Sequence, residues 1–258
     1  MFFKKSLIIL YILMVIISFS IVFLKSLYFS YRQILVIIIC MKYIDYQIHT
    51  GLENMAIDSK ILDEAILSNS KEPVFRFYGW LPACVSLGKN QDDSFIDYKF
   101  LKSIGVDCVR RQTGGRALFH NNELTYSYVT PASLIENGQN VSESYKYISS
   151  ILINIFKNLG IELSIGGCPR HITKNNYCMS ISTGADLCWN DKKFIGSAQC
   201  RKNGYILQHG SILLDYDKNL LSKIFSEPTE FDTIVTLKEI ATNIKLEDII
   251  NSFKNLYL

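Results

Sequence analysis

Three short apolar segments between Ala185 and Tyr216, separated by two tight turns, most limit the folds open to this chain. The segments are ADLCW, KFIGSAQCR and YILQHGSILLDY, and the turns contain Asn190-Asp191 and Lys202-Asn203-Gly204. Because Asn, Asp and Gly tolerate the backbone angles of tight hairpin turns, this pattern predicts an antiparallel meander. Three strands joined in this way form a sheet.

Helical and extended patterns surround the meander. Thr50 and Glu53 form a T-x-x-E capping box, which predicts an amphipathic helix over residues 51–68. Further helices are predicted over residues 94–104 and 142–159, with two or three more after Lys218 that should cover one face of the meander sheet. Additional strands are predicted at residues 75–78, 85–87, 106–110 and 124–129. We therefore expect an α+β fold, with a mixed or antiparallel sheet and flanking helices.

The 258 residues are 48% hydrophobic and 20% charged, which is enough for a full-sized core in one large domain or two small ones. No repeat, low-complexity tract or Pro/Ser linker divides residues 41–258, so we expect one domain there. Residues 1–40 hold four basic residues and no acid, so residues 41–258 contain 23 basic against 24 acidic residues. A nearly neutral body does not supply the charge that neutralises phosphates. We therefore expect no nucleic-acid partner.

The first forty residues differ from the rest in composition. Ser6 to Leu24 is nineteen residues long without a charge, enough to cross the hydrocarbon core of a bilayer. One interpretation is a single membrane span. The other is that translation begins at Met41, so that residues 1–40 are translated upstream sequence and residues 41–258 form the functional domain, which we favour. The second interpretation predicts a cytoplasmic protein, associated with a membrane only if residues 1–40 are expressed.

A Gly-Gly turn at residues 114–115, flanked by Arg111 and Arg116, is the first candidate binding site. Glycine lets the backbone approach a ligand, and guanidinium groups attract carboxylates or phosphates. A glycine-rich hairpin with solvated arginines explains the pattern equally well. Neither common nucleotide-binding glycine loop is present.

Small residues on two adjacent predicted strands form the second candidate. Gly196-Ser197-Ala198-Gln199 lies on one strand and Gln208-His209-Gly210-Ser211 on the next. Glycine within a strand weakens packing, so two such places on paired strands indicate close approach by a ligand. The alternative is a pair of β-bulges.

Seven cysteines are spaced irregularly, which predicts free thiols in a reducing compartment. Cys168, His171, Cys178, Cys188 and Cys200 fit no zinc-binding spacing, so no metal is expected. A nucleophilic cysteine is a more specific hypothesis than a metal site for these residues. Cys178 is one candidate, because Lys193 in the following hairpin could favour its thiolate.

Five segments together resemble the superfamily of lipoate-protein ligases, octanoyltransferases and biotin ligases. They fall in that family's order, at its approximate spacing, between about residues 50 and 215. The segments are GLENMAIDSKIL, FRFYGWLPACVSLGKNQ, RRQTGGRALFHNNELTYSYVTP, CMSISTGADLCWNDKKFIGSAQCR and LQHGSILLDYD. The resemblance implies the α+β catalytic-domain fold of lipoate and biotin protein ligases.

Within the superfamily, the chain most resembles the octanoyl-acyl carrier protein:protein N-octanoyltransferases that use a cysteine. In that pattern the acylated cysteine precedes a lysine by fifteen residues and the glycine of G-S-A-Q by eighteen, which are the offsets of Cys178, Lys193 and Gly196. The sequence departs from the pattern at Gln112, where proline is usual, and at Met179, where an aromatic residue often follows the cysteine.

The resemblance implies acyl transfer from octanoyl-acyl carrier protein, through a Cys178 thioester favoured by Lys193, to a lysine of a lipoyl-type domain. Such acceptors include a glycine-cleavage H protein and a 2-oxoacid dehydrogenase E2 component, and no cofactor is implied. The implied substrate-binding residues are Arg111, Thr113, Gly114, Gly115, Arg116, His120, Gly196, Ser197, Ala198, Gln199, His209, Gly210 and Ser211.

Three alternatives remain open from the sequence. The first is ATP-dependent lipoate-protein ligation, and the second is amide-to-amide transfer of an octanoyl group between lipoyl domains. The third is a membrane-anchored binding protein that keeps the pocket without turnover.

Overall fold

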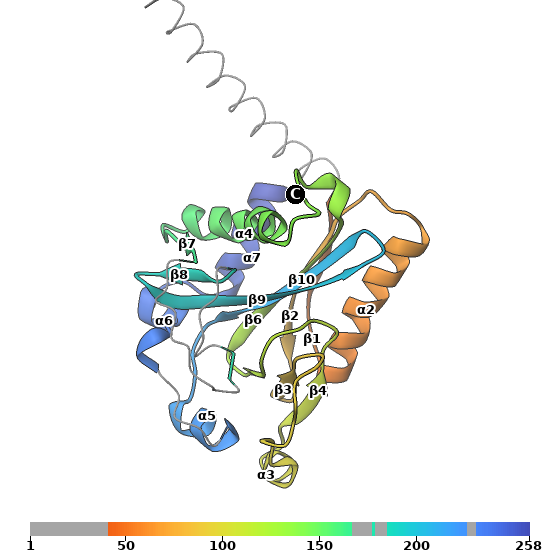
Figure 1. Cartoon of the computed structure of the whole chain (residues 1–258). Coiled ribbons are helices and arrows are strands. Elements are labelled where there is room, and N and C mark those ends of the chain that lie inside the picture. The colour runs from red at the N-terminus through yellow and green to blue at the C-terminus, as the bar shows by residue number, and fades with distance from the viewer. Residues whose placement is uncertain (1–40, 167–176, 179–184, 226–230) are drawn as a thin grey trace, which may run out of the picture. The chain divides into compact units, whose positions relative to one another are not determined.

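A large mixed sheet forms the centre of the computed structural model, which describes residues 41–166, 177–178, 185–225 and 231–258. Its first two strands are parallel and its other neighbours are antiparallel. The spatial order is β1 (Lys42–His49), β2 (Val74–Trp80), β6 (Glu123–Pro131), β10 (Tyr205–Leu213), β9 (Lys192–Lys202), β8 (Leu187–Trp189) and β7 (Ser164–Ile165) (Figure 1). The predicted α+β fold with a mixed sheet is confirmed.

A smaller sheet of three strands lies at the glycine-rich loop. Its order is β4 (Asp107–Arg110), β3 (Cys84–Leu87) and β5 (Leu118–His120). β3 pairs in parallel with β4 and antiparallel with β5. The chain therefore leaves β4, makes the loop that contains Gly114 and Gly115, and returns on β5.

The meander predicted from the sequence is β8, β9 and β10. Asn190 and Asp191 have φ angles of 46° and 62°, and Asn203 and Gly204 have φ angles of 49° and 80°. Both turns thus use consecutive positive φ angles, which match the twist of antiparallel strands. The turn chemistry fixes the register of the sheet that carries Lys193.

The helices are α2 (Gly51–Leu67), α3 (Tyr98–Ser103), α4 (Val141–Asn158), α5 (Lys218–Phe225), α6 (Leu237–Ile240) and α7 (Leu246–Tyr257), with short 3-10 turns at Ala132–Leu134 and Phe231–Thr233. The Thr50 capping box is present, as predicted. The helix predicted over residues 94–104 is wrong at its start. Asp97 accepts a hydrogen bond from the Phe100 amide and begins the helix there.

Helices cover both faces of the large sheet (Figure 1). On one face, Leu62 and Ala65 of α2 pack with Val129 and Leu207. On the other face, Phe253 of α7 stacks on Phe75 with ring centroids 4.3 Å apart, and the Ser252 hydroxyl of α7 donates to the Ile155 carbonyl of α4.

The C-terminal helices do not all cover the large sheet, contrary to the prediction. α7 packs on that sheet through Phe253. α5 instead packs Leu221, Ile224 and Phe225 into the core beneath the small sheet, where Phe225 lies 4.8 Å from Tyr177 between ring centroids. That contact supports the backbone immediately before Cys178.

Cys84, Cys108, Cys178 and Cys200 are free thiols, but Cys188 takes part in a disulfide bond. The expectation of free thiols throughout is therefore wrong at Cys188. Within the residues that the structure describes, no helix has the length and apolarity needed to cross a membrane. The segment from Ser6 to Leu24 lies outside those residues.

Candidate active site

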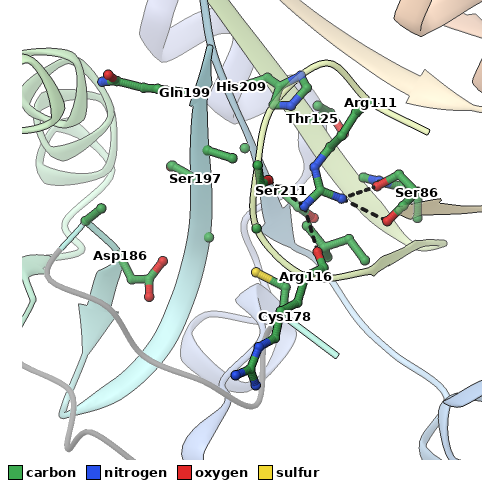
Figure 2. Close-up of a pocket in the computed structure, with 18 of the residues that line it drawn as sticks. Ser86, Arg111, Arg116, Thr125, Cys178, Asp186, Ser197, Gln199, His209 and Ser211 are labelled. Carbon is green, nitrogen blue, oxygen red and sulfur yellow. Dashed lines mark hydrogen bonds between the residues drawn. The ribbon is translucent and has the colours of Figure 1, made fainter. Parts of the chain in front are cut away.

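Cys178 lies on a short segment that is held against β5. Tyr177 forms a parallel bridge with Ala117, and the Cys178 amide donates to the Ala117 carbonyl at 2.8 Å. Tyr177 is buried, whereas Cys178 is partly exposed. The sulfur points into the cavity shown in Figure 2. The backbone is thus anchored while the thiol stays accessible.

Lys193 enters the same place from β9. Its side chain is only 2% exposed, and its Nζ lies 4.0 Å from the Cys178 Sγ. Nζ also donates to the Cys178 carbonyl at 3.0 Å and forms a 3.1 Å ion pair with Asp186. The structure therefore brings the two predicted catalytic residues together. It adds a buried carboxylate that the sequence reasoning missed.

A cavity of about 420 Å³ contains this pair, within the range typical of small-molecule sites. Every predicted site residue except Thr113 lines it. Thr113 is fully buried behind the wall. The wall also includes residues that were not predicted, namely Met55, Tyr78, Trp80, Ser86, Leu118, Thr125, Tyr145, Ala185 and Asp186.

Arg111 organises the glycine-rich loop from inside. Its two terminal nitrogens donate to the backbone carbonyls of Ser86, Gly114 and Arg116 at 2.7–3.0 Å. Gly115 has a φ of 93°, and a Cβ there would lie 3.1 Å from an Arg111 nitrogen. The positive φ therefore favours glycine at 115. At Gly114 nothing lies within 4 Å of an added Cβ, so this position is open to the cavity.

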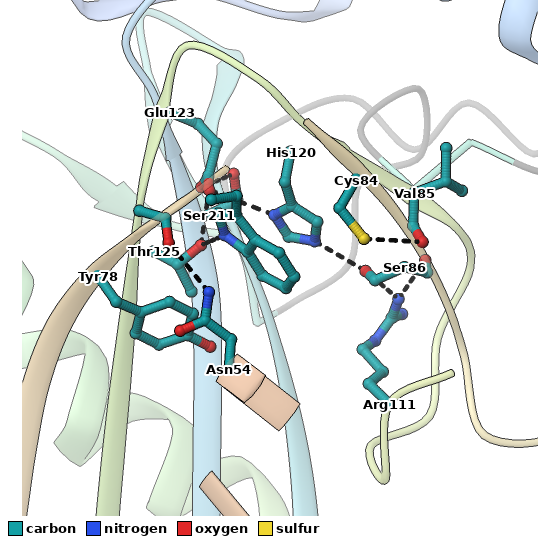
Figure 3. Close-up of polar contacts among 12 residues, drawn as sticks. Asn54, Tyr78, Cys84, Val85, Ser86, Arg111, His120, Glu123, Thr125 and Ser211 are labelled. Carbon is teal, nitrogen blue, oxygen red and sulfur yellow. Dashed lines mark hydrogen bonds and ion pairs between the residues drawn. The ribbon is translucent and has the colours of Figure 1, made fainter. Parts of the chain in front are cut away.

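His120 belongs to a buried chain of hydrogen bonds (Figure 3). Its Nε2 lies 2.8 Å from the Ser86 hydroxyl and its Nδ1 lies 3.3 Å from Glu123. Glu123 also accepts from Thr125 at 2.7 Å and Ser211 at 2.5 Å. Burial lowers the pKa of His120 below its ordinary value, although Glu123 acts in the opposite direction.

His209 forms a second chain of the same kind on the face toward α2. Its Nε2 lies 2.7 Å from the Thr113 hydroxyl, and its Nδ1 lies 3.1 Å from Asp58. Asp58 also accepts from the Tyr78 hydroxyl at 2.9 Å and pairs with Arg76 at 3.5 Å. Thr113 does not line the cavity, but it holds the ring of His209, which does.

The small residues on β9 and β10 are paired without a bulge. Gly196 faces Ser211 and Ser197 faces Gly210 within an uninterrupted register. A Cβ on Gly210 would come within 2.5 Å of the Gly196 carbonyl oxygen and 2.6 Å of the Tyr126 ring. The β-bulge alternative is wrong here, and Gly210 is needed for strand and side-chain approach.

The three buried acidic residues of the site were not predicted from the sequence, and the reason is the same for all three. Glu123, Asp58 and Asp186 are buried, yet each stands in a segment where a surface acid would look the same. Glu123 and Asp186 do occur at or beside a strand start, next to apolar residues, which is the available signal. Among the described residues no cluster of three or more metal-ligating side chains occurs, and Cys168 and His171 lie outside them.

The sequence matches the family described as lipoyl protein ligase A/B catalytic domain over residues 50–256. An octanoyltransferase LipM from Clostridioides difficile (strain 630) is 38% identical over 185 residues, which are 70% of this chain and 68% of the relative. The octanoyltransferase LipM of Carboxydothermus hydrogenoformans is 40% identical over 186 residues, 71% of this chain and 68% of the relative.

Solved structures are similar at the level of the fold. A crystal structure of lipoate-protein ligase A bound with ATP matches with a TM-score of 0.64 at 20% identity, covering 84% of this chain and 83% of that one. P. falciparum LipL1 in complex with lipoate matches with a TM-score of 0.62 at 23% identity, covering 84% of this chain and 59% of that one.

Proposed function

The chain belongs to the lipoyl protein ligase A/B catalytic domain family, and from that premise we propose that it is an octanoyltransferase of protein lipoylation. It takes an octanoyl group from a thioester on acyl carrier protein and passes it to a lysine of a lipoyl-type domain. Its relatives named octanoyltransferase support the reaction, and their identity of 38% and 40% supports close kinship.

The observation that carries the proposal is the placement of a partly exposed thiol beside a buried lysine in one cavity. Cys178 and Lys193 are the proposed catalytic residues, with Nζ 4.0 Å from Sγ. A thioester is already activated, so transfer requires a thiolate acceptor and a donor to the carbonyl oxygen. The positive charge of the Lys193 ammonium stabilises the Cys178 thiolate. The same ammonium can donate a hydrogen bond to the carbonyl oxygen of the octanoyl thioester.

The first step moves the acyl group onto the enzyme. The Cys178 thiolate attacks the carbonyl carbon of the octanoyl thioester and forms a new carbon–sulfur bond. The bond from that carbon to the donor sulfur breaks. Its electron pair leaves with the carrier thiolate, which takes a proton from water.

The second step moves the acyl group to the acceptor. The neutral lysine amine attacks the Cys178 thioester, the carbon–nitrogen bond forms and the carbon–sulfur bond breaks. The nitrogen loses a proton to water, and the cysteine returns as thiolate. The product is an octanoyl amide on a lipoyl-type domain, such as a glycine-cleavage H protein or a 2-oxoacid dehydrogenase E2 component.

The other residues of the cavity wall bind the acyl chain or shape the glycine-rich loop at residues 114–115. Gly114 leaves open space against the cavity, and Gly210 leaves room for the carbonyl oxygen of Gly196 on the paired strand. Ser197, Ala198, Gln199 and Ser211 line the cavity from these strands, and Gly115, Arg116, His120 and His209 complete it. We assign substrate binding to this wall.

The test is transfer from octanoyl-acyl carrier protein to an apo lipoyl domain with ATP omitted. The proposal predicts full transfer, observed as an octanoyl mass on the acceptor. If transfer needs free octanoate and ATP, the chain is a ligase. If it needs an octanoylated protein as donor, the chain is an amidotransferase.

We also propose that residues 41–258 form the catalytic domain and act in the cytoplasm. The site residues and the family match all lie within this range. Residues 1–40 are then upstream sequence that the reaction does not require.

A further inference from the structure

We propose that Tyr126, a buried residue behind the cavity wall, positions the Ser197 hydroxyl so that its hydrogen points into the cavity and binds a carbonyl oxygen of the acyl donor. The inference rests on the proposed function, which makes that donor the octanoyl thioester of acyl carrier protein. It goes beyond that function because it gives Ser197 a defined ligand atom. It also assigns a positioning role to Tyr126, which the sequence did not single out.

Tyr126, Gly210 and Ser197 lie directly opposite one another on three neighbouring strands. Gly210 of β10 pairs with Tyr126 of β6 on one side and with Ser197 of β9 on the other. The Tyr126 hydroxyl reaches across β10 and lies 2.7 Å from the Ser197 Oγ. A Cβ at position 210 would lie 2.6 Å from the Tyr126 ring and 2.8 Å from the Ser197 Oγ. Gly210 therefore leaves the space that this hydrogen bond needs.

A chain of side-chain hydrogen bonds runs from the partly exposed Arg201 to Tyr126. Arg201 Nη1 donates to the Ser144 hydroxyl at 3.0 Å. That hydroxyl donates to Gln199 Oε1 at 3.2 Å and to a backbone carbonyl of its own helix at 2.8 Å. Gln199 Nε2 donates to Gln208 Oε1 at 2.7 Å, and Gln208 Nε2 donates to the Tyr126 hydroxyl at 2.6 Å. Since a guanidinium only donates, the chain begins with a donor, and each amide accepts on one side and donates on the other.

The direction of this chain decides which way the Ser197 hydrogen points. The Tyr126 oxygen accepts from Gln208, so its own hydrogen needs another acceptor. Tyr126 is fully buried, and the structure places the Ser197 oxygen beside its hydroxyl as that acceptor. Within the described part of the chain, the Ser197 hydroxyl has no further hydrogen-bond partner. Ser197 is partly exposed and lines the cavity in Figure 2, so its own hydrogen is available to a ligand there.

The chemistry of the acyl donor makes a carbonyl oxygen the partner that fits this hydrogen. A hydroxyl hydrogen needs an acceptor, and the hydrocarbon part of an octanoyl group has none. The donor brings carbonyl oxygens at the thioester itself and at the amides of the carrier arm. Both are recognised by the same hydrogen bond. Ser197 thus adds a neutral donor to the strand that also carries Lys193.

The test uses two amides that cannot transfer their acyl group, octanoyl-aminopantetheine and N-ethyloctanamide. Both keep the acyl carbonyl, and only the first keeps the carbonyls of the carrier arm. The measurement is the probe concentration that halves the rate of iodoacetamide alkylation at Cys178 in the full chain, relative to the rate of the same variant without probe. A loss of affinity for both probes assigns the acyl carbonyl to Ser197, and a loss for the longer probe alone assigns a carbonyl of the arm.

Ser197→Ala is expected to raise the half-protecting concentration of octanoyl-aminopantetheine by about 3- to 10-fold, the effect of one lost hydrogen bond. Tyr126→Phe should raise it by about 2-fold or more. The double variant should match Ser197→Ala within about 1.5-fold, because Tyr126 acts through Ser197. Tyr205→Phe is the matched control and should behave as the parent does. Tyr205 is a buried tyrosine of β10 whose hydroxyl donates to Asn69 and Ser70, away from the cavity wall.

Parent-like protection in Ser197→Ala overturns the proposal, and this variant decides the question even if Tyr126→Phe does not fold. A double variant whose effect is the product of the two single effects also overturns it, since a merely structural role of Tyr126 would add to the loss at Ser197. A parent that neither probe protects has the same meaning. Protection requires no acyl transfer. Failure of octanoyl transfer with the expected pattern intact would count against the proposed function and not against the roles of Ser197 and Tyr126.

Discussion

Lys193 is half of a buried ion pair, so removing it alone exposes the thiol to an unbalanced carboxylate. Lys193→Met deletes the ammonium 4.0 Å from Sγ and leaves Asp186 without its 3.1 Å partner. We expect the alkylation midpoint of Cys178 to rise by about one pH unit or more. Lys192→Met, in the exposed part of the same hairpin, is the control. An unchanged profile in Lys193→Met would remove this lysine from the site.

His120 makes stability depend on pH in a defined direction. Burial lowers its pKa in the folded protein, whereas the unfolded chain protonates near pH 6.5. The unfolded state therefore binds more protons below about pH 6.5, and the free energy of unfolding falls as the pH drops. Between pH 7.5 and 5.5, urea midpoints should fall further for the parent than for His120→Gln. Parallel changes in the two proteins would contradict this account.

At the residue scale, the sequence singled out Cys178 and Lys193, which the structure brings together, but not the buried acids around them. Cys178 and Lys193 were predicted because their offsets match a family pattern. Asp186 and Glu123 were not predicted because burial decides their role, and burial depends on strands far apart in sequence. Glu123 accepts a hydrogen bond from Ser211 of β10, which is 88 residues away in the sequence, and no local pattern encodes that contact.

Among the structural elements, the β9–β10 pair gives a test that separates packing from function. Gly210→Ala places a Cβ within 2.5 Å of a backbone oxygen, so it should lower the free energy of unfolding by about 1–3 kcal/mol. Gly114→Ala meets nothing within 4 Å and should leave stability nearly unchanged. Its methyl group should instead reduce octanoyl transfer, because it faces the cavity. Equal urea midpoints for the two variants would contradict this packing.

Helix caps and tight turns were predicted correctly, because their conformation depends on residues that are adjacent in the sequence. The capping box at Thr50 and the positive-φ turns of the meander both appear in the structure. The three-residue strand β5 and the placement of α5 were not predicted. Both depend on tertiary contacts, since β5 exists through its pairing with β3 and α5 through its packing beneath the small sheet.

For the molecule as a whole, residues 1–40 can be tested separately from the chemistry. An anchor with Lys4 and Lys5 inside would place residues 41–258 on the other side of the membrane, away from acyl carrier protein. A protein that begins at Met41 avoids this conflict, so we expect it to be soluble and fully active in octanoyl transfer. Aggregation, or loss of a transfer that the full-length chain retains in membranes, would show that the apolar segment is part of the working protein.

The central claim is that one cysteine carries the acyl group between donor and acceptor. The direct measurement is the intact mass of the protein after incubation with octanoyl-acyl carrier protein, followed by peptide mapping of the adduct. We predict one octanoyl group on Cys178 that hydroxylamine removes and that a lipoyl domain discharges. Cys178→Ser should carry none. An octanoyl group that persists in Cys178→Ser, on Cys84 or any other cysteine, would contradict the account.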